Sequence, residues 1–350
     1  MSRPLRLGLL GCADIAVRRM LPAVAAHPDL EIAVIGSRDP DRAKAVAERF
    51  GGRPAAGYDA VLAAEDVDLV YAPVPAALHE TWVSAALEAG KHVLAEKPLT
   101  LDAEHTRRLL DRAADRGLAL VENVLFVHHP QHEAVRRLVA DGAIGELHSL
   151  HAMFTIPEPP EDDIRHRPEL GGGALWDVGV YPLRAALHLL GPRLTVTGAV
   201  LTAGTGRRVD TAGAALLRTP DGVTAQLTFG MAHAYRARYE LHGSTGRITV
   251  DRAYTPAADL APLVRLHGPD GSRDIPLAPA DQVERALTAL VTAVRGRSAP
   301  DPAVLRQAEL LSELRRYAGP PDPTTAGPDD RRTRRPPDPA DPARSAPDPT

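Results

Sequence analysis

The sequence predicts an α/β protein in two parts: an N-terminal doubly wound parallel sheet, followed by an α+β domain with a large, mainly antiparallel sheet. Three observations support this prediction. Strand and helix signals alternate over residues 5–122, which is typical of a parallel sheet. Residues 194–250 hold successive strands with few helices between them, which favours an antiparallel sheet. From residue 319 onward the chain is dense in Pro, Asp and Arg. We therefore expect domains at 1–123 and 124–318, and a disordered tail at 319–350.

The first part alternates short apolar runs with stretches of helical spacing. Such short apolar runs are typical of strands that are buried on both faces. Asp39 precedes Pro40, and this pair predicts a helix that Asp39 caps and Pro40 begins. The predicted strands are residues 5–10, 31–36, 68–72, 92–95 and 118–122, and the predicted helices are 14–26, 40–50, 78–89 and 102–116.

The second part has fewer helices and several strands joined by turns. Pro220-Asp221-Gly222 and Gly243-Ser244-Thr245-Gly246 are strong hairpin signals. The predicted helices are 132–140, 173–190, 280–295 and 302–317, and the predicted strands are 147–156, 194–203, 211–218, 223–229, 235–242 and 247–250.

Composition excludes several classes of protein. The formal net charge of -4 over 350 residues implies no large basic face for nucleic acid. No apolar run approaches the roughly 20 residues of a membrane span, and the N-terminus lacks the apolar stretch of a signal peptide. Cys12 is the only cysteine, so the chain forms no internal disulfide. We therefore expect a cytoplasmic protein that does not bind membranes.

A glycine turn joins the first predicted strand to the first helix. In the G-x-G-x-x-G frame the residues are Gly11, Ala13 and Ala16. The two small residues still allow the backbone to approach a pyrophosphate, and the helix N-terminus faces the phosphates. We predict a Rossmann dinucleotide site that also includes the intervening Cys12, Asp14 and Ile15.

The end of the second strand indicates which dinucleotide binds. An NAD site usually has an Asp or Glu there, whereas this chain has Ser37 and Arg38. A hydroxyl and a guanidinium suit a 2′-phosphate, and we expect Asp39 to cap the following helix instead. The sequence therefore predicts NADP(H) as cofactor.

Glu96-Lys97-Pro98 follows the fourth strand, at the sheet edge where open α/β sheets bind ligands. Pro98 stops the strand beside Lys97. Pro73 ends the third strand at the same rim. His79 opens the next helix, where it either packs or contacts the nicotinamide side of the cofactor.

A second polar group follows the three glycines at 171–173. Asp177 and Tyr181 are spaced i, i+4 and share one helix face. The glycines allow the backbone to pass close to a ligand. Because Lys97 and this helix belong to different domains, we expect a ligand bound between the domains to contact both.

Gly11-x-Ala13-x-x-Ala16, Glu96-Lys97-Pro98 and Asp177-x-Gly179-x-Tyr181 together resemble the glucose–fructose oxidoreductase / inositol dehydrogenase / MocA family over residues 4–318. The chain is particularly similar to the NADPH-dependent nucleotide-sugar 3-ketoreductases of deoxysugar pathways. Segments behind that similarity include Glu122-Asn123 and Asp163-Ile164-Arg165. Most of the wider family has His where this chain has Tyr181, and the tyrosine form also occurs in other sugar and diol branches.

The resemblance implies reduction of the C3 keto group of a dTDP-linked keto-deoxysugar by NADPH. Tyr181 would donate the proton, with Lys97 lowering its pKa and polarising the oxygen, or Lys97 would itself donate it. Asp177 would orient Lys97 or the nicotinamide ribose. The cofactor site would also include Asn123 and Arg165. The substrate would meet Arg19, Tyr235 and Thr255 besides Lys97 and Tyr181.

The resemblance also implies a homodimer or homotetramer, in which the sheet of the second domain would join the subunits. The alternating runs of that sheet indicate an apolar or mixed outer face that a monomer would leave wet. No metal is assigned, because no carboxylate or cysteine stands at ligand spacing from His128, His129 and His132.

Two other functions compete with this one. The first is an NADP-dependent dehydrogenase of a free aldose or diol, which would not need basic residues for a diphosphate. Arg165, Arg167, Arg236 and Arg238 could supply such residues. The second is a non-catalytic NADP-sensing regulator, which would not need Lys97, Asp177 and Tyr181 together.

Overall fold

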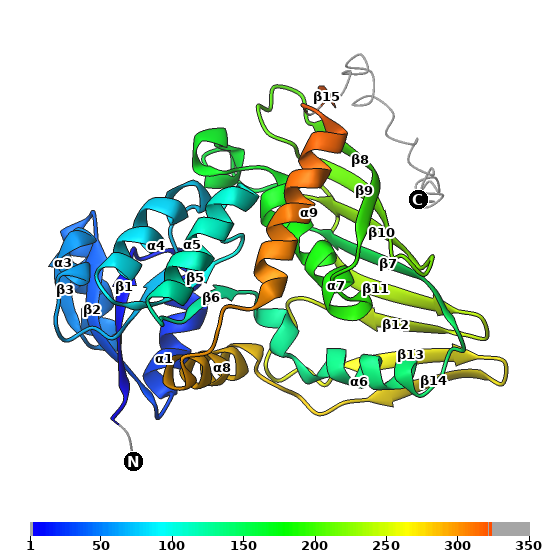
Figure 1. The fold of residues 1–350 in the computed structure, drawn as a ribbon, viewed down its shortest axis with the longest axis horizontal. Helices are drawn as coiled ribbons and strands as arrows, with labels where there is room; N and C mark the ends of the chain where they lie inside the picture. The colour runs from blue at the N-terminus through cyan, green and yellow to red at the C-terminus, as the bar shows by residue number, and fades with distance from the viewer. Residues whose placement is uncertain (1–2, 321, 324–350) are drawn as a thin grey trace, which may run out of the picture.

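The computed structural model describes residues 3–320 and 322–323, folded around two β-sheets (Figure 1). The first sheet has six strands in the order β3-β2-β1-β4-β5-β6, and the second has nine in the order β14-β13-β12-β11-β7-β10-β9-β8-β15. The predicted fold class is therefore confirmed.

All strand pairs of the first sheet are parallel. The strand order reverses between β1 and β4, and at such a point the carboxyl ends of the strands leave a crevice for a ligand. Its strands are β1 (Leu5–Leu10), β2 (Leu30–Ser37), β3 (Arg53–Ala56), β4 (Leu69–Ala72), β5 (His92–Glu96) and β6 (Leu120–Asn123), and its helices are α1 (Leu21–Ala26), α2 (Pro40–Phe50), α3 (Asp59–Leu62), α4 (His79–Glu88) and α5 (Ala103–Asp115).

Two elements of this half were not predicted. Strand β3 is an edge strand of sequence RPAA and is mostly exposed, so it has no apolar run to mark it. Helix α3 has only four residues. The predicted helix over 14–26 does form, but Ala16–Met20 make a π-helical turn before α1 begins.

The second sheet is mainly antiparallel, as predicted, although β7 pairs with β10 in parallel. The hairpin of β13 and β14 was missed because β14, of sequence GSRDIP, is polar and exposed. The strands are β7 (Leu147–Thr155), β8 (Thr195–Ala203), β9 (Ala212–Arg218), β10 (Thr224–Gly230), β11 (Arg236–Gly243), β12 (Arg247–Asp251), β13 (Leu263–Gly268), β14 (Gly271–Pro276) and β15 (Asp322–Pro323).

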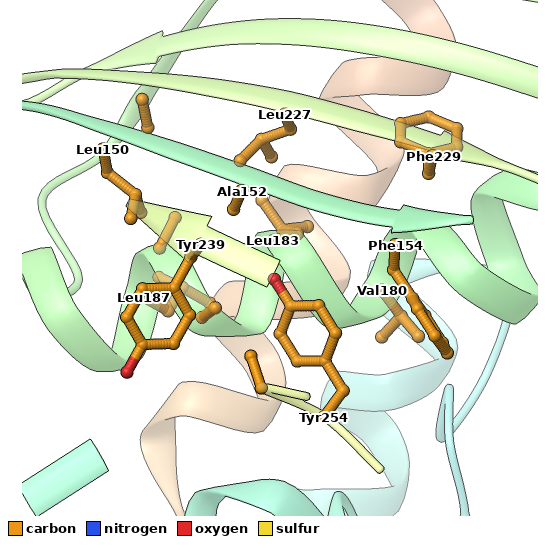
Figure 2. Packing of buried hydrophobic residues seen from close by; sticks show 14 of the residues in the cluster. Leu150, Ala152, Phe154, Val180, Leu183, Leu187, Leu227, Phe229, Tyr239 and Tyr254 are labelled. Carbon is orange, nitrogen blue, oxygen red and sulfur yellow. The ribbon is translucent and has the colours of Figure 1, made fainter. Parts of the chain in front are cut away.

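Helices α6 (Pro130–Ala140), α7 (Val180–Leu190) and α9 (Pro302–Ala318) lie beside this sheet (Figure 1). Figure 2 shows Leu183 of α7 beneath the strands that carry Ala152 and Leu227. Burying one such leucine contributes roughly 1.5–3 kcal/mol. Short helical turns complete this part at Leu125–His128, Ile164–His166, Pro168–Leu170 and Leu175–Gly179, and another lies in the first part at Ala76–Leu78.

Helix α8 (Gln282–Gly296) packs on the first sheet's core rather than the second's. Val283, Leu287, Leu290 and Val294 lie in one apolar cluster with residues of α1 and β1. Figure 1 shows α8 next to α1. The chain therefore crosses between the two cores more than once, and the boundary after residue 123 stays a prediction.

The prediction of a disordered tail can be compared with the structure only at residues 319–320 and 322–323. Residues 322–323 form the short strand β15, which pairs in parallel with β8, so these two residues contradict a tail without structure. Residues 321 and 324–350 lie outside the described part, and so does the prediction of disorder for them. No helix within residues 3–320 is both long and apolar enough to span a bilayer.

Candidate active site

A cavity of about 1060 Å³ lies at the carboxyl ends of the strands of the first sheet. Residues from the parts of the chain that form both sheets line it. It collects most of the residues that the sequence predicted. They are Gly11, Cys12, Ala13, Asp14, Ile15, Arg19, Ser37, Arg38, Pro73, Glu96, Lys97, Pro98, Asn123, Arg165, Asp177, Tyr181 and Thr255. Two of these predicted residues, Gly11 and Thr255, are 244 positions apart in the chain and line the same cavity.

Three predicted residues do not line this cavity. Ala16 is buried in the first core, where its small side chain lets the helix approach the sheet. Tyr235 is exposed, and its hydroxyl lies 2.8 Å from the hydroxyl of Thr255, which lines the cavity.

His79 was expected either to pack or to contact the cofactor, and the structure places it in packing. Its ring is fully buried, and Nδ1 lies 3.1 Å from the carbonyl oxygens of both Pro98 and Leu99. His79 therefore supports the turn that follows Lys97 from below and does not reach the cavity.

The glycine turn has the geometry of a dinucleotide site. Gly11 has φ +98°, and a Cβ there would lie 2.9 Å from the Tyr58 hydroxyl oxygen. Its N–H donates to the Gly36 carbonyl at 2.8 Å, which ties the turn to the end of β2. Ala13, Asp14 and Ile15, at the start of the following helix, line the cavity. The first N–H groups of a helix have no partner within the helix and can donate to a phosphate.

At the end of β2, Ser37, Arg38 and Asp39 all line the cavity, but the Asp39 side chain is engaged at the start of α2. The Asp39 carboxylate accepts from the backbone N–H groups of Asp41 at 3.1 Å and Arg42 at 3.2 Å, so it caps α2 as predicted. The side chain of Arg42 also lines the cavity. It was not predicted, although a basic residue in the first turn of the helix that follows Arg38 was a signal for a phosphate ligand.

Lys97 is held against Asp177 at the centre of the cavity. Its Nζ donates to the Asp177 backbone oxygen at 2.8 Å and to Oδ1 at 2.9 Å, and its side chain is 13% exposed. Burial favours the neutral amine, but the Asp177 carboxylate outweighs burial and raises the pKa of Lys97 above its usual range. Lys97 is therefore a fixed cation at neutral pH. The Lys97–Pro98 peptide bond is cis.

Asp177 binds two cations at once. Its second oxygen, Oδ2, accepts from Arg165 Nε at 2.6 Å, and Arg165 also pairs with Asp163 at 3.0 Å. Burial alone would raise the pKa of the Asp177 carboxyl, but Lys97 and Arg165 together hold it below its usual range. The carboxylate therefore stays ionised and fixes both partners.

The glycines at 171–173 were expected to let the backbone approach a ligand. Gly171 and Gly172 do line the cavity. A Cβ on Gly172, however, would lie 2.5 Å from the Arg165 carbonyl oxygen. Because Gly172 has no side chain, the chain can pack against the turn that presents Arg165 to Asp177. The structure therefore shows that a glycine is needed at this position for packing.

Tyr181 begins α7 beside this ionic group. Lys97 Nζ lies 5.1 Å from the centre of its ring. Within the described residues the Tyr181 hydroxyl makes no hydrogen bond, so its proton is available to a ligand. Burial raises the pKa of this phenol and outweighs the opposing effect of Lys97. Lys97 therefore lowers the pKa of Tyr181, as expected, but burial raises it by more, and the phenol is protonated at neutral pH.

Two aromatic side chains, one from β7 and one from the loop after β12, pack against the Tyr181 ring. Phe154 meets it edge-on with ring centres 4.8 Å apart, and the Tyr254 ring lies 5.8 Å away. Figure 2 shows Phe154 and Tyr254 reaching toward the same region from different segments. Both line the cavity. Neither was predicted, because an inward strand position such as Phe154 indicates only a core residue and Tyr254 lies in a loop without a motif.

The Glu96 carboxylate accepts hydrogen bonds from two neighbouring strands of the first sheet. Its Oε1 accepts from the Tyr71 hydroxyl and from Asn123 Nδ2, both at 2.7 Å. These bonds join the ends of β4, β5 and β6, and they set the direction in which Lys97 leaves the sheet.

A Rossmann sheet whose glycine turn shares a cavity with a lysine, an aspartate and a protonated tyrosine defines the class of dinucleotide-dependent oxidoreductases. Residues 5–124 match the oxidoreductase family with an NAD-binding Rossmann fold, and residues 132–249 match the GFO/IDH/MocA C-terminal domain. The chain belongs to the GFO/IDH/MocA family, as its resemblance indicated.

Relatives of known activity are similar over nearly the whole chain. The dTDP-3,4-didehydro-2,6-dideoxy-alpha-D-glucose 3-reductase of Streptomyces violaceoruber is 54% identical over 328 residues, covering 90% of this chain and 96% of the relative. The enzyme of the same name from Actinomadura kijaniata is 50% identical over 317 residues, with 90% and 96% covered. The crystal structure of KijD10, a 3-ketoreductase from Actinomadura kijaniata in complex with NADP and TDP-benzene, superimposes with a TM-score of 0.89 at 48% identity, covering 92% of this chain and 99% of that chain.

Proposed function

We propose that this chain catalyses the NADPH-dependent reduction of the C3 keto group of a dTDP-linked keto-deoxysugar. The observation that carries the proposal is the group of Lys97, Asp177 and Tyr181, which faces a cavity that begins at the glycine turn. The names of the relatives at about half identity supply the substrate class.

The donors around the first sheet fit NADPH. The turn at Gly11 and the helix start provide backbone N–H groups for the pyrophosphate. Ser37, Arg38 and Arg42 offer a hydroxyl and two guanidinium groups to a 2′-phosphate, while Asp39 is used as a cap. When bound, NADPH supplies the hydride for the carbonyl carbon.

The chain's own groups supply the proton and the charge. Reduction of a ketone develops negative charge on its oxygen, which a fixed cation and a proton donor stabilise. Lys97 has three N–H bonds and gives two to Asp177, so one remains for the substrate oxygen. Tyr181, protonated and without a partner among the described residues, donates the proton.

Residues at the other side of the cavity suit the nucleotide. Arg19 and Thr255 line it, and the Thr255 hydroxyl is braced by Tyr235. We assign Arg19 to a phosphate of the dTDP group, with Thr255 and Tyr235 as hydroxyl partners. Arg165 and Asp177 close the remaining side near the cofactor's nicotinamide half.

Turnover of the Tyr181→Phe variant tests this proposal. General acid catalysis contributes about 10²–10⁴-fold, so kcat should fall by that factor while NADPH affinity stays unchanged. Lys97→Ala should be at least as damaging, because it removes the cation as well. Tyr317→Phe, at a tyrosine of α9 that is 58% exposed, is the matched control and should keep native turnover.

Near-native rates for both Tyr181→Phe and Lys97→Ala would overturn the assignment of these residues. Assays with the native chain should compare a dTDP-linked keto-sugar with free aldoses and diols. Turnover of a free aldose alone would replace the substrate class, and tight NADPH binding without any turnover would favour a sensor.

We also propose that the chain works in the cytoplasm as a homodimer or homotetramer, with residues 1–123 and 124–318 as its two domains. The outer face of the second sheet supports the assembly. It exposes Val200, Leu216 and Met153 by 59%, 42% and 37%, on strands β8, β9 and β7. Exposed apolar side chains on neighbouring strands are typical of a protein interface.

A further inference from the structure

Three potential metal ligands meet on the outer face of the second sheet, away from the cavity. His151 lies on β7, and Glu240 and His242 lie on β11. The register places Glu240 directly opposite His151, and His242 follows on the same face two residues later. The inward neighbours Leu150, Ala152 and Leu241 are buried in the core, so the ligand group is on the side of the sheet opposite the core.

The distances suit one ion. One ligand atom from each residue lies within 4.8 Å of the other two. His242 Nε2 and Glu240 Oε2 are 3.3 Å apart. Two ligands of a tetrahedral zinc with bonds of about 2.0–2.1 Å stand roughly 3.3 Å apart, so this pair is already at ligand spacing.

The two oxygens of the Glu240 carboxylate have different neighbours. Its Oε1 is paired with the Arg238 guanidinium and accepts from the Thr249 hydroxyl at 3.2 Å. Its Oε2 faces His242. Metal-binding carboxylates are commonly oriented in this way, with one oxygen held by neighbours and the other directed at the ion.

The two histidine rings lie next to each other, with ring centres 4.8 Å apart. His242 Nε2 is buried and makes no hydrogen bond within the described residues, although Glu240 Oε2 lies 3.3 Å away. A metal ion bound by both atoms would give this buried nitrogen a partner.

We propose that His151, Glu240 and His242 bind one divalent transition-metal ion of the zinc class. Two imidazoles and one carboxylate favour zinc, nickel or copper over magnesium or calcium, which prefer oxygen ligands. The three side chains leave the fourth position of a tetrahedral ion to water or to a group from outside the chain. The site is independent of the reductase proposal, because none of its residues lines the cofactor cavity.

Equilibrium dialysis of the full chain, prepared without a histidine tag, against zinc chloride tests this proposal. The native chain should bind one zinc ion that the His151→Ala/His242→Ala double variant does not bind. His148→Ala is the matched control, because His148 is also an exposed histidine of β7 but is not one of the three ligands. That variant should bind zinc as the native chain does.

Glu240→Gln provides a second variant that keeps the shape of the side chain. Loss of the carboxylate charge should weaken zinc binding by about 10–100-fold, as for other changes at metal ligands and their supports. NADPH binding by all variants shows that they are folded. Equal zinc stoichiometry and affinity in the native chain and the double variant would overturn the proposal, as would native affinity in Glu240→Gln.

Discussion

At the scale of single residues, the site depends on how charge is distributed around Asp177. The Asp177 carboxylate binds two cations, Lys97 through one oxygen and Arg165 through the other, and thereby keeps both in fixed positions. The sequence predicted these residues from their types and their places at strand and helix ends. It could not predict which of them pair, because Arg165 and Asp177 come together only through the close packing at Gly172.

The preference for NADPH is a residue-scale prediction. A hydrogen bond to a charged group is worth about 1.5–3 kcal/mol, so the native chain should bind NADPH roughly 10- to 100-fold more tightly than NADH. Arg38→Ala should erase most of that difference, and adding Arg42→Ala should erase the remainder, because both side chains line the cavity at the end of β2. Fluorescence titration with each cofactor measures the ratio. Equal affinity of the native chain for both would contradict the assignment.

At the scale of elements, short apolar runs and helix caps predicted most helices and strands, whereas the exposed edge strands were not predicted. β3 and β14 are strands because neighbouring strands offer them hydrogen bonds, not because of an apolar pattern of their own. Helix α8 was located correctly but grouped with the second sheet. Its apolar stripe fits either core equally well on sequence grounds, and only the path of the chain decides where it packs.

The packing of α8 leads to an element-scale prediction. Leu287 is fully buried in the first core. Leu287→Ala should lower the free energy of unfolding by about 2–5 kcal/mol, through lost burial and the cavity left behind. Glu284→Ala, at an exposed position of the same helix, is the control and should change it little. Urea denaturation measures both, and a Leu287→Ala variant as stable as the native chain would mean that α8 does not support the first sheet.

At the scale of the whole molecule, several histidines are kept neutral by burial. His79, His92, His128, His129, His132 and His188 all have a lowered pKa. Between the folded and unfolded pKa values the unfolded chain binds more protons, so stability rises with pH. The contribution of neutral histidine is therefore complete above about pH 6.5 and is lost as pH falls toward the folded pKa.

His188 allows a quantitative form of this prediction. Burial, together with Arg136 and Arg184, lowers its pKa from 6.5 to about 4. At pH 5 this should cost on the order of 2 kcal/mol relative to pH 7.5. The variant His188→Gln should lose less stability over that interval, whereas His148→Gln, at an exposed site, should follow the native chain. Thermal midpoints at both pH values provide the measurement, and identical acid losses in native and His188→Gln chains would contradict the prediction.

The outer face of the second sheet determines the expected assembly. Val200, Leu216 and Met153 lie on β8, β9 and β7. On the same side, β11 to β13 carry charges such as Arg238, Glu240 and Arg265, with Leu263 of β13 as a further exposed apolar side chain. A second copy that covers the apolar half would remove Val200 and Leu216 from water at roughly 25 cal/mol per Å². A charge at either residue would then be buried without a partner in the assembly.

Light scattering at micromolar concentration should therefore give two or four times the chain mass of 37.3 kDa. Leu216→Asp should shift the mass toward one chain while NADPH binding persists, because Leu216 points away from the cavity and the core. Leu260→Asp is the control, since Leu260 is 36% exposed but lies in a loop between β12 and β13. A native chain that scatters as a monomer would refute the assembly, and an unchanged oligomer in Leu216→Asp would place the interface on another surface.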